Sequence, residues 1–489
     1  MDIVDLWTGR RASALRASLR MTNEAFAAHL GAAVRTVATW EAKPDMVLSA
    51  AMQEILDSAL KGADEDVQRR FAMILNVSGS LDTEAARTAE RTLHSTVRPA
   101  PEAAVEASQQ NWRQVRQYLT EQGIDLAART ADLYDAELRV EHVPALSTPA
   151  WLPQRPVLLE DVKLRWNEAS PQPRLTGSEA EARTALPLRA PGHAFTQYTS
   201  AIRYLRPPAL FENRSSYRLL DVDWSNGKGA MTFGLSTFFN KLDIGEVLAH
   251  EAGAADVSGN LNWAHLPFRS LLGDLFDLSN RAVNPGISTL TIRRDMTTGD
   301  GSFFLLRRDP TQVTNGRHYS LLPAGEFQPA SISPQSLLVD LDIWRNMVRE
   351  YAEEMLGQPE HDGSGGTPVD YEVWPFYRDM TAARNAGTIR PYVLGVILDA
   401  LSLNASIATA TVIDDHIFDN LFRDRVATNP EGEVVSSIGN NKPIHGLTFD
   451  EETVTRLTTQ EPLGQTSAAC LTLAWKHRAT ILGAGSSTS

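Results

Sequence analysis

Apolar residues follow helical spacing through residues 7–61 and predict a compact bundle of four short helices. Within it, two helical patterns meet at a tight corner that contains Gly31. The second pattern places Val37 and Trp40 on one side and ends before Pro44, which cannot continue a helix. Its other side is therefore expected to face outward.

Further along the chain, apolar and polar residues alternate as expected of strands. Residues 215–224 and 229–239 form two such runs separated by a turn that contains Asn226-Gly227, and this arrangement predicts a hairpin. A second hairpin is predicted within 286–310, where Gly299-Asp300-Gly301 joins the two runs. Glycine suits both turns because it adopts positive φ without steric cost.

With 489 residues, the chain is too long for one core. The patterns predict a multidomain protein with an N-terminal all-α helix-turn-helix domain and an α+β body. Residues 94–110 are rich in Pro, Ala, Ser and Gln, show no apolar period and are interpreted as a linker. The expected domains are 1–93 (helix-turn-helix with a helical extension), 111–285 (α+β, of unknown role) and 286–489.

Composition narrows the class of protein. The net charge of −14 argues against a protein that coats nucleic acid along its whole surface. Residues 1–43 carry six basic and four acidic residues, a net +2, which leaves −16 for the remainder. No apolar run approaches the ~18 residues of a membrane span, and no secretory signal is evident. With Cys470 as the single cysteine, no disulfide can form within the chain, and a cytoplasmic location is expected.

Residues 10–61 resemble the helix-turn-helix of the Xre/Cro-type repressors of bacteria and phages. The residues that carry the resemblance are Thr22, Glu24, Phe26-Ala27, Leu30-Gly31, Thr36-Val37 and Trp40-Glu41. The resemblance implies that the second helix of the pair enters the major groove of double-stranded DNA, and that the protein binds as a homodimer on two half-sites. By position, the expected DNA contacts are Asn23 (phosphate), Val34, Arg35, Thr36, Ala38 and Thr39.

The chemistry of these positions fits the expectation. Arg35 can donate two hydrogen bonds to a guanine edge, worth about 1–3 kcal/mol of discrimination. Val34 can contact a thymine methyl group. Ala33 departs from the pattern, because the family often has a capping Ser there, and its absence weakens the helix start by about 1 kcal/mol. The alternative interpretation is a small helical bundle with no role in DNA binding.

A second cluster of candidate residues lies on a predicted helix over 342–357. One side of this helix forms an apolar stripe, and Arg349, Glu350, Glu353 and Glu354 are expected on the other. Carboxylates at this spacing repel one another, and Mg²⁺ would reverse that penalty. The alternative is an ordinary solvated face, with Arg349 and Glu353 as an i,i+4 pair.

This helix resembles the Nudix box. Arg349, Glu350, Glu353 and Glu354 match its R-E-U-x-E-E core, and Gly325 matches its opening glycine. The resemblance implies a Nudix-like α/β/α domain over 286–489, in which Glu350, Glu353 and Glu354 hold Mg²⁺ against a nucleoside diphosphate linkage. Ser331 stands where the first glutamate belongs, the following loop is ten residues too long, and Gly357 comes one residue late.

These departures indicate a degenerate box, which favours effector binding over catalysis. The sequence therefore predicts a DNA-binding transcriptional regulator whose C-terminal domain senses a nucleotide-like or other small effector, with Mg²⁺ as the one candidate cofactor. The alternative is a Mg²⁺-dependent Nudix-type hydrolase with a DNA-tethering head. A third option is an interaction scaffold that binds no small molecule.

Overall fold

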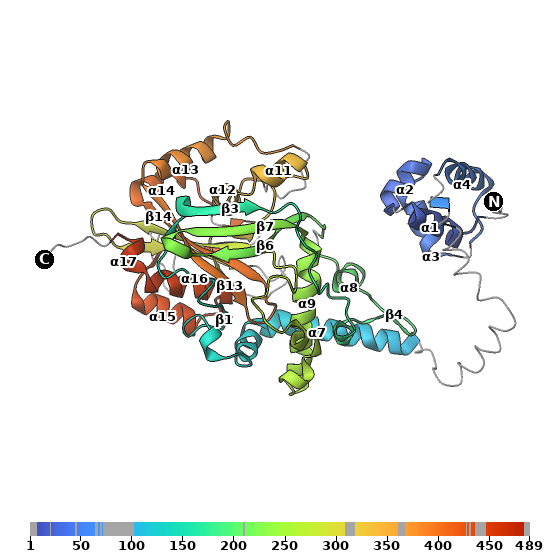
Figure 1. The fold of residues 1–489 in the computed structure, drawn as a ribbon, viewed down its shortest axis with the longest axis horizontal. Helices are drawn as coiled ribbons and strands as arrows, with labels where there is room; N and C mark the ends of the chain where they lie inside the picture. The colour runs from blue at the N-terminus through green and yellow to red at the C-terminus, as the bar shows by residue number, and fades with distance from the viewer. Residues whose placement is uncertain are drawn as a thin grey trace. The chain divides into compact units, whose positions relative to one another are not determined.

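In a computed structural model, the chain forms two compact units, Met1–Pro99 (unit 1) and Ala100–Ser489 (unit 2) (Figure 1). Each unit is described by itself. The structure describes residues 7–19, 21–44, 46–63, 67–68, 71, 102–208, 211–308, 318–359, 367–426, 428–429, 432–435 and 446–483.

Unit 1 is a helical bundle that matches the predicted spacing. Its helices are α1 (Gly9–Ser18), α2 (Asn23–Leu30), α3 (Val34–Ala42) and α4 (Ala50–Gly62). Phe26, Val37 and Trp40 are buried in its core. Gly31 turns the chain between α2 and α3 with φ +64°, a conformation that glycine adopts without strain. Most of the helical extension predicted up to residue 93 lies outside the described residues.

The predicted linker is wrong over its second half. Residues 102–110 belong to α7 (Glu102–Ala131), while residues 94–101 lie outside the described part of the chain. The first turns of α7 lack an apolar period because little of their surface is buried. The Ala, Glu and Gln that fill these turns are strong helix formers, so helix forms there without a buried stripe.

Unit 2 is organised around an eight-stranded mixed sheet with the order β1-β13-β14-β8-β9-β17, to which β12 adds at β8 and β2 at β13. Strands β14 and β8 are parallel, and the other pairs are antiparallel. The strands are β1 (Ala145–Leu146), β2 (Val157–Leu158), β8 (Gly286–Arg294), β9 (Gly301–Phe303), β12 (Ala324–Glu326), β13 (Ile389–Asp399), β14 (Ala405–Asp414) and β17 (Leu447–Thr448).

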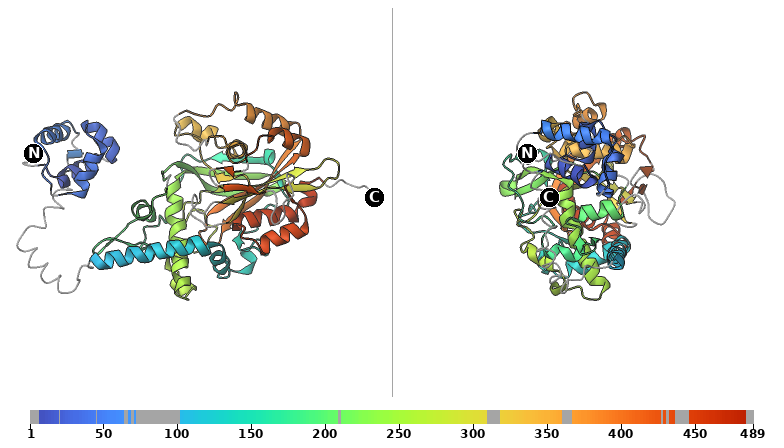
Figure 2. Two further views of the ribbon diagram at one scale, coloured as in Figure 1. Left: turned by 180° about the vertical axis from the view of Figure 1, so that it is seen from behind. Right: turned by 90° about the vertical axis from the view of Figure 1, so that its right-hand side faces the viewer.

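Helices cover both faces of this sheet (Figures 1 and 2). On one face, α16 (Gln465–Lys476) packs on the central strands, with α15 (Glu451–Thr459) beside it. The other face carries α12 (Ile343–Glu350), α13 (Pro375–Asn385) and α14 (Asp415–Leu421). Alternate residues of the strands supply the two cores: Leu290 packs on the α16 side, whereas Ile287 packs on the α12 side. The sheet is thus buried on both faces.

A bulge in β13 preserves this division. The pairing of β13 with β14 shifts between Val393 and Gly395, so that Val393 and Val396 both face the α12 side. Gly395 has φ +136°, and a Cβ there would lie 2.8 Å from the carbonyl oxygen of Trp151. Only glycine fits this close approach of two backbones.

Two smaller sheets complete the described β structure of unit 2, together with a short hairpin. One comprises β3 (Val162–Trp166), β7 (Gly229–Thr237) and β6 (Ser215–Asp223); the other comprises β11 (Tyr319–Leu321), β10 (Leu305–Arg308), β16 (Gly432–Val435) and β15 (Thr428–Asn429). The β6–β7 and β8–β9 pairs confirm both predicted hairpins, and positive-φ glycines lie in each turn. The second predicted run divides, however, because β10 leaves the large sheet for the smaller one.

The remaining described elements of unit 2 are a short hairpin, five helices and short 3₁₀ turns. They are β4 (Leu188–Ala190), β5 (His193–Ala194), α8 (Tyr198–Leu205), α9 (Phe238–Val257), α10 (Pro267–Leu272), α11 (Pro334–Val339) and α17 (Arg478–Ile481), with short 3₁₀ turns η1 (Ala136–Leu138), η2 (Leu159–Asp161), η3 (Glu181–Ala185), η4 (Ser225–Gly227) and η5 (Trp263–His265).

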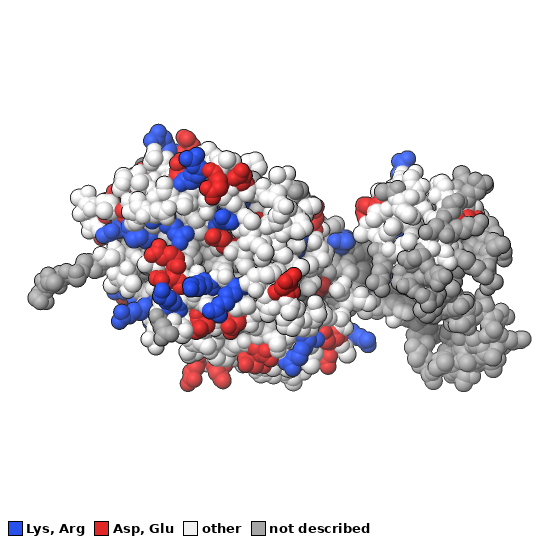
Figure 3. All heavy atoms as spheres, turned by 45° about the horizontal axis from the view of Figure 1, so that its top comes forward, with Lys and Arg blue, Asp and Glu red and all other residues white. Residues whose placement is uncertain are grey.

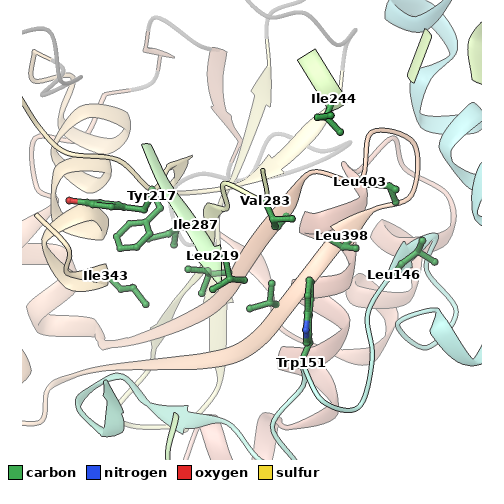
Figure 4. Close-up of a cluster of buried hydrophobic side chains, with 14 of the residues drawn as sticks. Leu146, Trp151, Tyr217, Leu219, Ile244, Val283, Ile287, Ile343, Leu398 and Leu403 are labelled. Atoms are coloured by element: carbon green, nitrogen blue, oxygen red, sulfur yellow. The ribbon is translucent and has the colours of Figure 1, made fainter. Parts of the chain in front are cut away.

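The boundary predicted at residue 285 does not divide the fold. Figure 4 shows Leu146, Tyr217 and Ile244 in one apolar cluster with Ile287 and Leu398. Strands β1 and β2 come from the expected middle domain, yet they pair with β13. Residues 111–285 and 286–489 therefore share a core and form one compact unit.

Candidate nucleic-acid interface and carboxylate helix

One side of α3 presents most of the residues assigned to DNA. Val37 and Trp40 are each 2 % exposed and anchor the helix on the core of unit 1. On the opposite side, Val34 is 43 % exposed, and Arg35, Ala38 and Thr39 are also exposed. Thr36 is half-buried at the edge of this surface. The predicted base-contacting positions thus form one continuous outward face.

The start of α3 has no capping side chain, as predicted from Ala33. Ala33 occupies the N-cap position with extended backbone, and no side chain caps the helix there. Thr39 uses its hydroxyl hydrogen within the helix, donating to the carbonyl oxygen of Arg35 at 2.7 Å. The Thr39 oxygen can still accept a hydrogen bond. This residue therefore suits a base amino group better than a base carbonyl.

Asn23, which was predicted to contact a DNA phosphate, also forms a hydrogen bond within unit 1. Its side-chain amide donates to Glu41 Oε2 at 2.9 Å, and the other oxygen of Glu41 accepts from Arg16. Arg16 also donates to the carbonyl oxygen of Met21 at 2.8 Å. Glu41 thereby fastens α1 and the start of α2 to the end of α3. Only the second amide hydrogen of Asn23 therefore remains to donate to a phosphate.

In unit 2, the carboxylate helix is more deeply buried than its pattern predicts. It begins as α12 and continues as a π-helix, η6 (Tyr351–Met355). The predicted apolar stripe is confirmed, since Trp344, Met347 and Tyr351 are all buried. The opposite side is not solvated, however: Arg349 is 5 % exposed and Glu354 is 1 % exposed. The wider π turn also changes the α-helical spacing from Glu350 onward.

Arg349 is held in a buried network. It donates to Tyr371 Oη at 2.6 Å and to the carbonyl oxygen of Gln328 at 2.8 Å, and it lies 3.5 Å from Asp340 Oδ1. The Tyr371 hydroxyl donates to Asp340 at 2.6 Å, and burial raises the pKa of Tyr371. Asp340 Oδ2 accepts from the backbone amide of Ala330 at 2.9 Å. Arg349 therefore fixes the strand-to-helix connection to α12.

The structure brings Gly325 together with two of the predicted carboxylates. A Cβ at Gly325 would lie 2.2 Å from Glu350 Cδ, so the carboxyl group of Glu350 packs directly on the backbone of β12 and would have to move if Gly325 were replaced. Glu354 accepts from the backbone amide of Ala324 at 3.2 Å and lies 3.9 Å from Arg308. Glu353 is half-buried. The motif residues thus brace β12 against the helix.

This donor set does not fit a magnesium ion. Glu350 packs on Gly325 and accepts from Asn346 at 3.3 Å, and Glu354 is engaged by a backbone amide and Arg308. In the part of the chain that the structure describes, no three His, Cys, Asp or Glu side chains are grouped as metal ligands. The metal assignment to Glu350, Glu353 and Glu354 thus finds no matching geometry, and we derive no chemistry through a bound metal.

A buried polar cluster between α7, α8 and α9 was not predicted. Tyr198 Oη and His250 Nδ1 lie 2.8 Å apart, and the His250 ring stacks on Trp112. Beside them, Arg116 forms an ion pair with Glu246. Burial and the positive charge of Arg116 lower the pKa of His250 to about 3. The cluster joins three helices that are far apart in sequence, so helical spacing within any one of them could not have revealed it.

Comparisons with known proteins leave the family open. No protein-family model matches the chain, and no curated protein matches it. Among the described residues, no helix is both long and apolar enough to cross a membrane. Any function must therefore be argued from the residues and their placement.

Proposed function

We propose that this protein is a sequence-specific DNA-binding transcriptional regulator in which α3 enters the major groove. The observation that carries the proposal is the outward face of α3, where Val34, Arg35, Ala38 and Thr39 are exposed while Val37 and Trp40 are buried. Arg35 is the only basic residue in α3, and the acidic Glu41 is held by Arg16 and Asn23. The exposed face thus offers one cation, one acceptor and methyl groups to base edges.

Unit 2 supplies the signal-responding part in this proposal. A regulator of this kind binds DNA as a homodimer. A nucleotide-like effector changes the affinity of the regulator for DNA when the effector binds the DNA-free protein and the DNA-bound protein with different affinities. Catalysis is not part of the proposal. Arg349 and Glu354 are buried in contacts that hold the fold, so the hydrolase alternative gains no support from the geometry.

The test is selection of bound fragments from genomic DNA with the full chain, followed by titration of the recovered sequence. We expect one palindromic motif. Replacing Arg35 with alanine should cost about 1–3 kcal/mol against one base pair of each half-site and relax the preference there. Lys43→Ala is the matched control, because Lys43 is exposed just beyond the end of α3. Lys43→Ala should weaken the binding of all DNA sequences equally.

Two results would contradict the proposal. The first is a lack of any enriched sequence. The second is an Arg35→Ala variant that recovers the same motif with the same preference at every position. Repeating the titration with a panel of nucleotides tests the assignment of unit 2, because an effector should shift the affinity for the motif but leave the recognised sequence unchanged.

A further inference from the structure

Unit 2 is acidic overall, and on the face drawn in Figure 3 its basic and acidic side chains are interspersed. One stretch of its sequence departs from this mixture. Residues 182–211 contain four arginines and no Asp or Glu. The four, which we name the arginine surface, are Arg183, Arg189, Arg203 and Arg206, and all are exposed.

The fold brings together the elements that carry three of these arginines, Arg189, Arg203 and Arg206. Strands β4 and β5 pair as a hairpin, and the exposed Arg189 lies on it at the register shift between the Leu188–Ala194 and Ala190–His193 pairs. The hairpin is held on α7, where Ser108 Oγ accepts from the Leu188 amide at 3.0 Å and Gln109 donates to the Leu188 carbonyl oxygen at 2.9 Å. Figures 1 and 2 show α8 beside this hairpin, at the N-terminal end of α7.

Aromatic contacts connect the hairpin to the end of α8. Phe195, which follows β5, lies 5.7 Å from the ring of Tyr204. The Arg203 guanidinium lies 5.4 Å from the ring of Phe239 and 5.8 Å from that of Phe211. None of the four arginines is in an ion pair with a described carboxylate. Glu181 and Glu212, which flank the stretch, are the nearest acidic residues in sequence.

We propose that the arginine surface binds the phosphate backbone of double-stranded DNA, outside the site read by α3. This inference rests on the proposed function, since it assigns unit 2 a second contact with the same duplex. Exposed guanidinium groups without carboxylate partners can contact phosphates without first breaking an ion pair. Phosphate contacts carry no base preference, so the surface adds affinity and salt dependence but no sequence specificity.

The experiment compares two duplexes with the full chain. The short duplex contains only the two half-sites, and the long one extends about two helical turns, or ~20 base pairs, on each side. The test variant is Arg189→Gln with Arg206→Gln, two exposed side chains that form no ion pair or aromatic contact with any residue that the structure describes. The matched control is Lys163→Gln with Arg165→Gln, which removes two exposed cations from β3.

On the long duplex, each lost phosphate contact should reduce the slope of log K against log salt by about 0.9, so the test variant should lose about 1.8 for each protomer and about 3.6 for the homodimer. Between 50 and 200 mM salt, wild-type affinity should therefore fall about 150-fold more than that of the variant. On the short duplex, the two proteins should have equal slopes. The control variant should match the wild type on both duplexes.

Equal slopes for wild type and test variant on the long duplex would overturn the inference, as would an equal change in the control variant. Either result leaves the proposed function intact, because the short duplex reports α3 alone. If the full chain binds neither duplex, the proposed function itself fails. A test variant that loses binding to an acidic polypeptide but not to the long duplex would identify a protein partner and also overturn the assignment to DNA.

Discussion

Acid should destabilise unit 2 through a single buried histidine. His250 lies on α9, is 3 % exposed, and pairs with Tyr198 Oη at 2.8 Å. Desolvation is the main reason that its pKa falls to about 3, and the neighbouring positive charge of Arg116 lowers the pKa further. The folded unit therefore keeps this imidazole neutral at pH values where an exposed histidine is charged.

The sign and size of the effect follow from proton binding. Above the ordinary histidine pKa of 6.5, the folded and unfolded states both hold the ring neutral, and the pH has no effect through it. Below that value the unfolded state takes up a proton that the folded state refuses. The free energy of unfolding then falls by about 1.4 kcal/mol per pH unit, which amounts to about 2 kcal/mol at pH 5. At pH 3 the folded state also begins to bind the proton, and the total loss is about 4 kcal/mol.

The assay is urea unfolding at pH 7 and pH 5, followed by hydrogen exchange of peptides from α9 so that unit 1 does not contribute. In His250→Phe, the loss of stability between the two pH values should be about 2 kcal/mol smaller than in the wild type. Carboxylates that titrate in this range are common to both proteins and cancel in the difference. His416→Phe, at an exposed histidine, is the control and should behave as the wild type. The same pH dependence in His250→Phe and wild type would refute the reasoning.

Two further predictions concern the packing of unit 2. Replacing Arg349 with glutamine should cost about 3–5 kcal/mol, because the buried Asp340 loses its positively charged partner. The exposed Arg378→Gln is the control and should cost no more than about 0.5 kcal/mol. Thermal melts of both variants measure these losses, and an Arg349→Gln protein as stable as wild type would show that the network does not hold the fold. Gly395→Ala should cost more than about 2 kcal/mol, because the new Cβ would lie 2.8 Å from a backbone oxygen. Gly387→Ala is the control and should cost about 1 kcal/mol, because Gly387 also has positive φ (+75°) but has open space around it. Equal losses of stability in denaturant unfolding would contradict the steric argument.

The sequence predicted unit 1 well because its folding information is local. Phe26, Val37 and Trp40 were placed in the core from helical spacing alone, and they are buried. The same spacing could not predict how the helices are fastened. The contacts of Glu41 with Arg16 and Asn23 join residues 25 and 18 positions apart, and periodicity carries no information about such pairs.

Unit 2 was less predictable because its sheet joins distant segments. Strand β1 pairs Ala145 with Asp399, and no alternation of apolar residues reveals a pairing across that much sequence. The hairpins were predicted correctly because their strands are adjacent and their turns contain glycine. The start of α7 was missed for the opposite reason. Helix-forming composition without an apolar stripe was interpreted as a linker, although intrinsic propensity alone favours helix there.

The two candidate sites show why motif letters and burial must be considered together. In α3, the residues singled out by spacing lie outward, where Arg35 can meet a partner without desolvating a structural ion pair. In α12 and η6, Arg349 and Glu354 lie inward, and their hydrogen-bonding capacity is used on Tyr371, Gln328 and Ala324. A ligand at the second site would have to replace bonds that hold β12 and the helix together, at a cost of several kcal/mol. The free energy available for binding is therefore greater at the exposed face of α3, and this difference is why the proposal assigns recognition to unit 1.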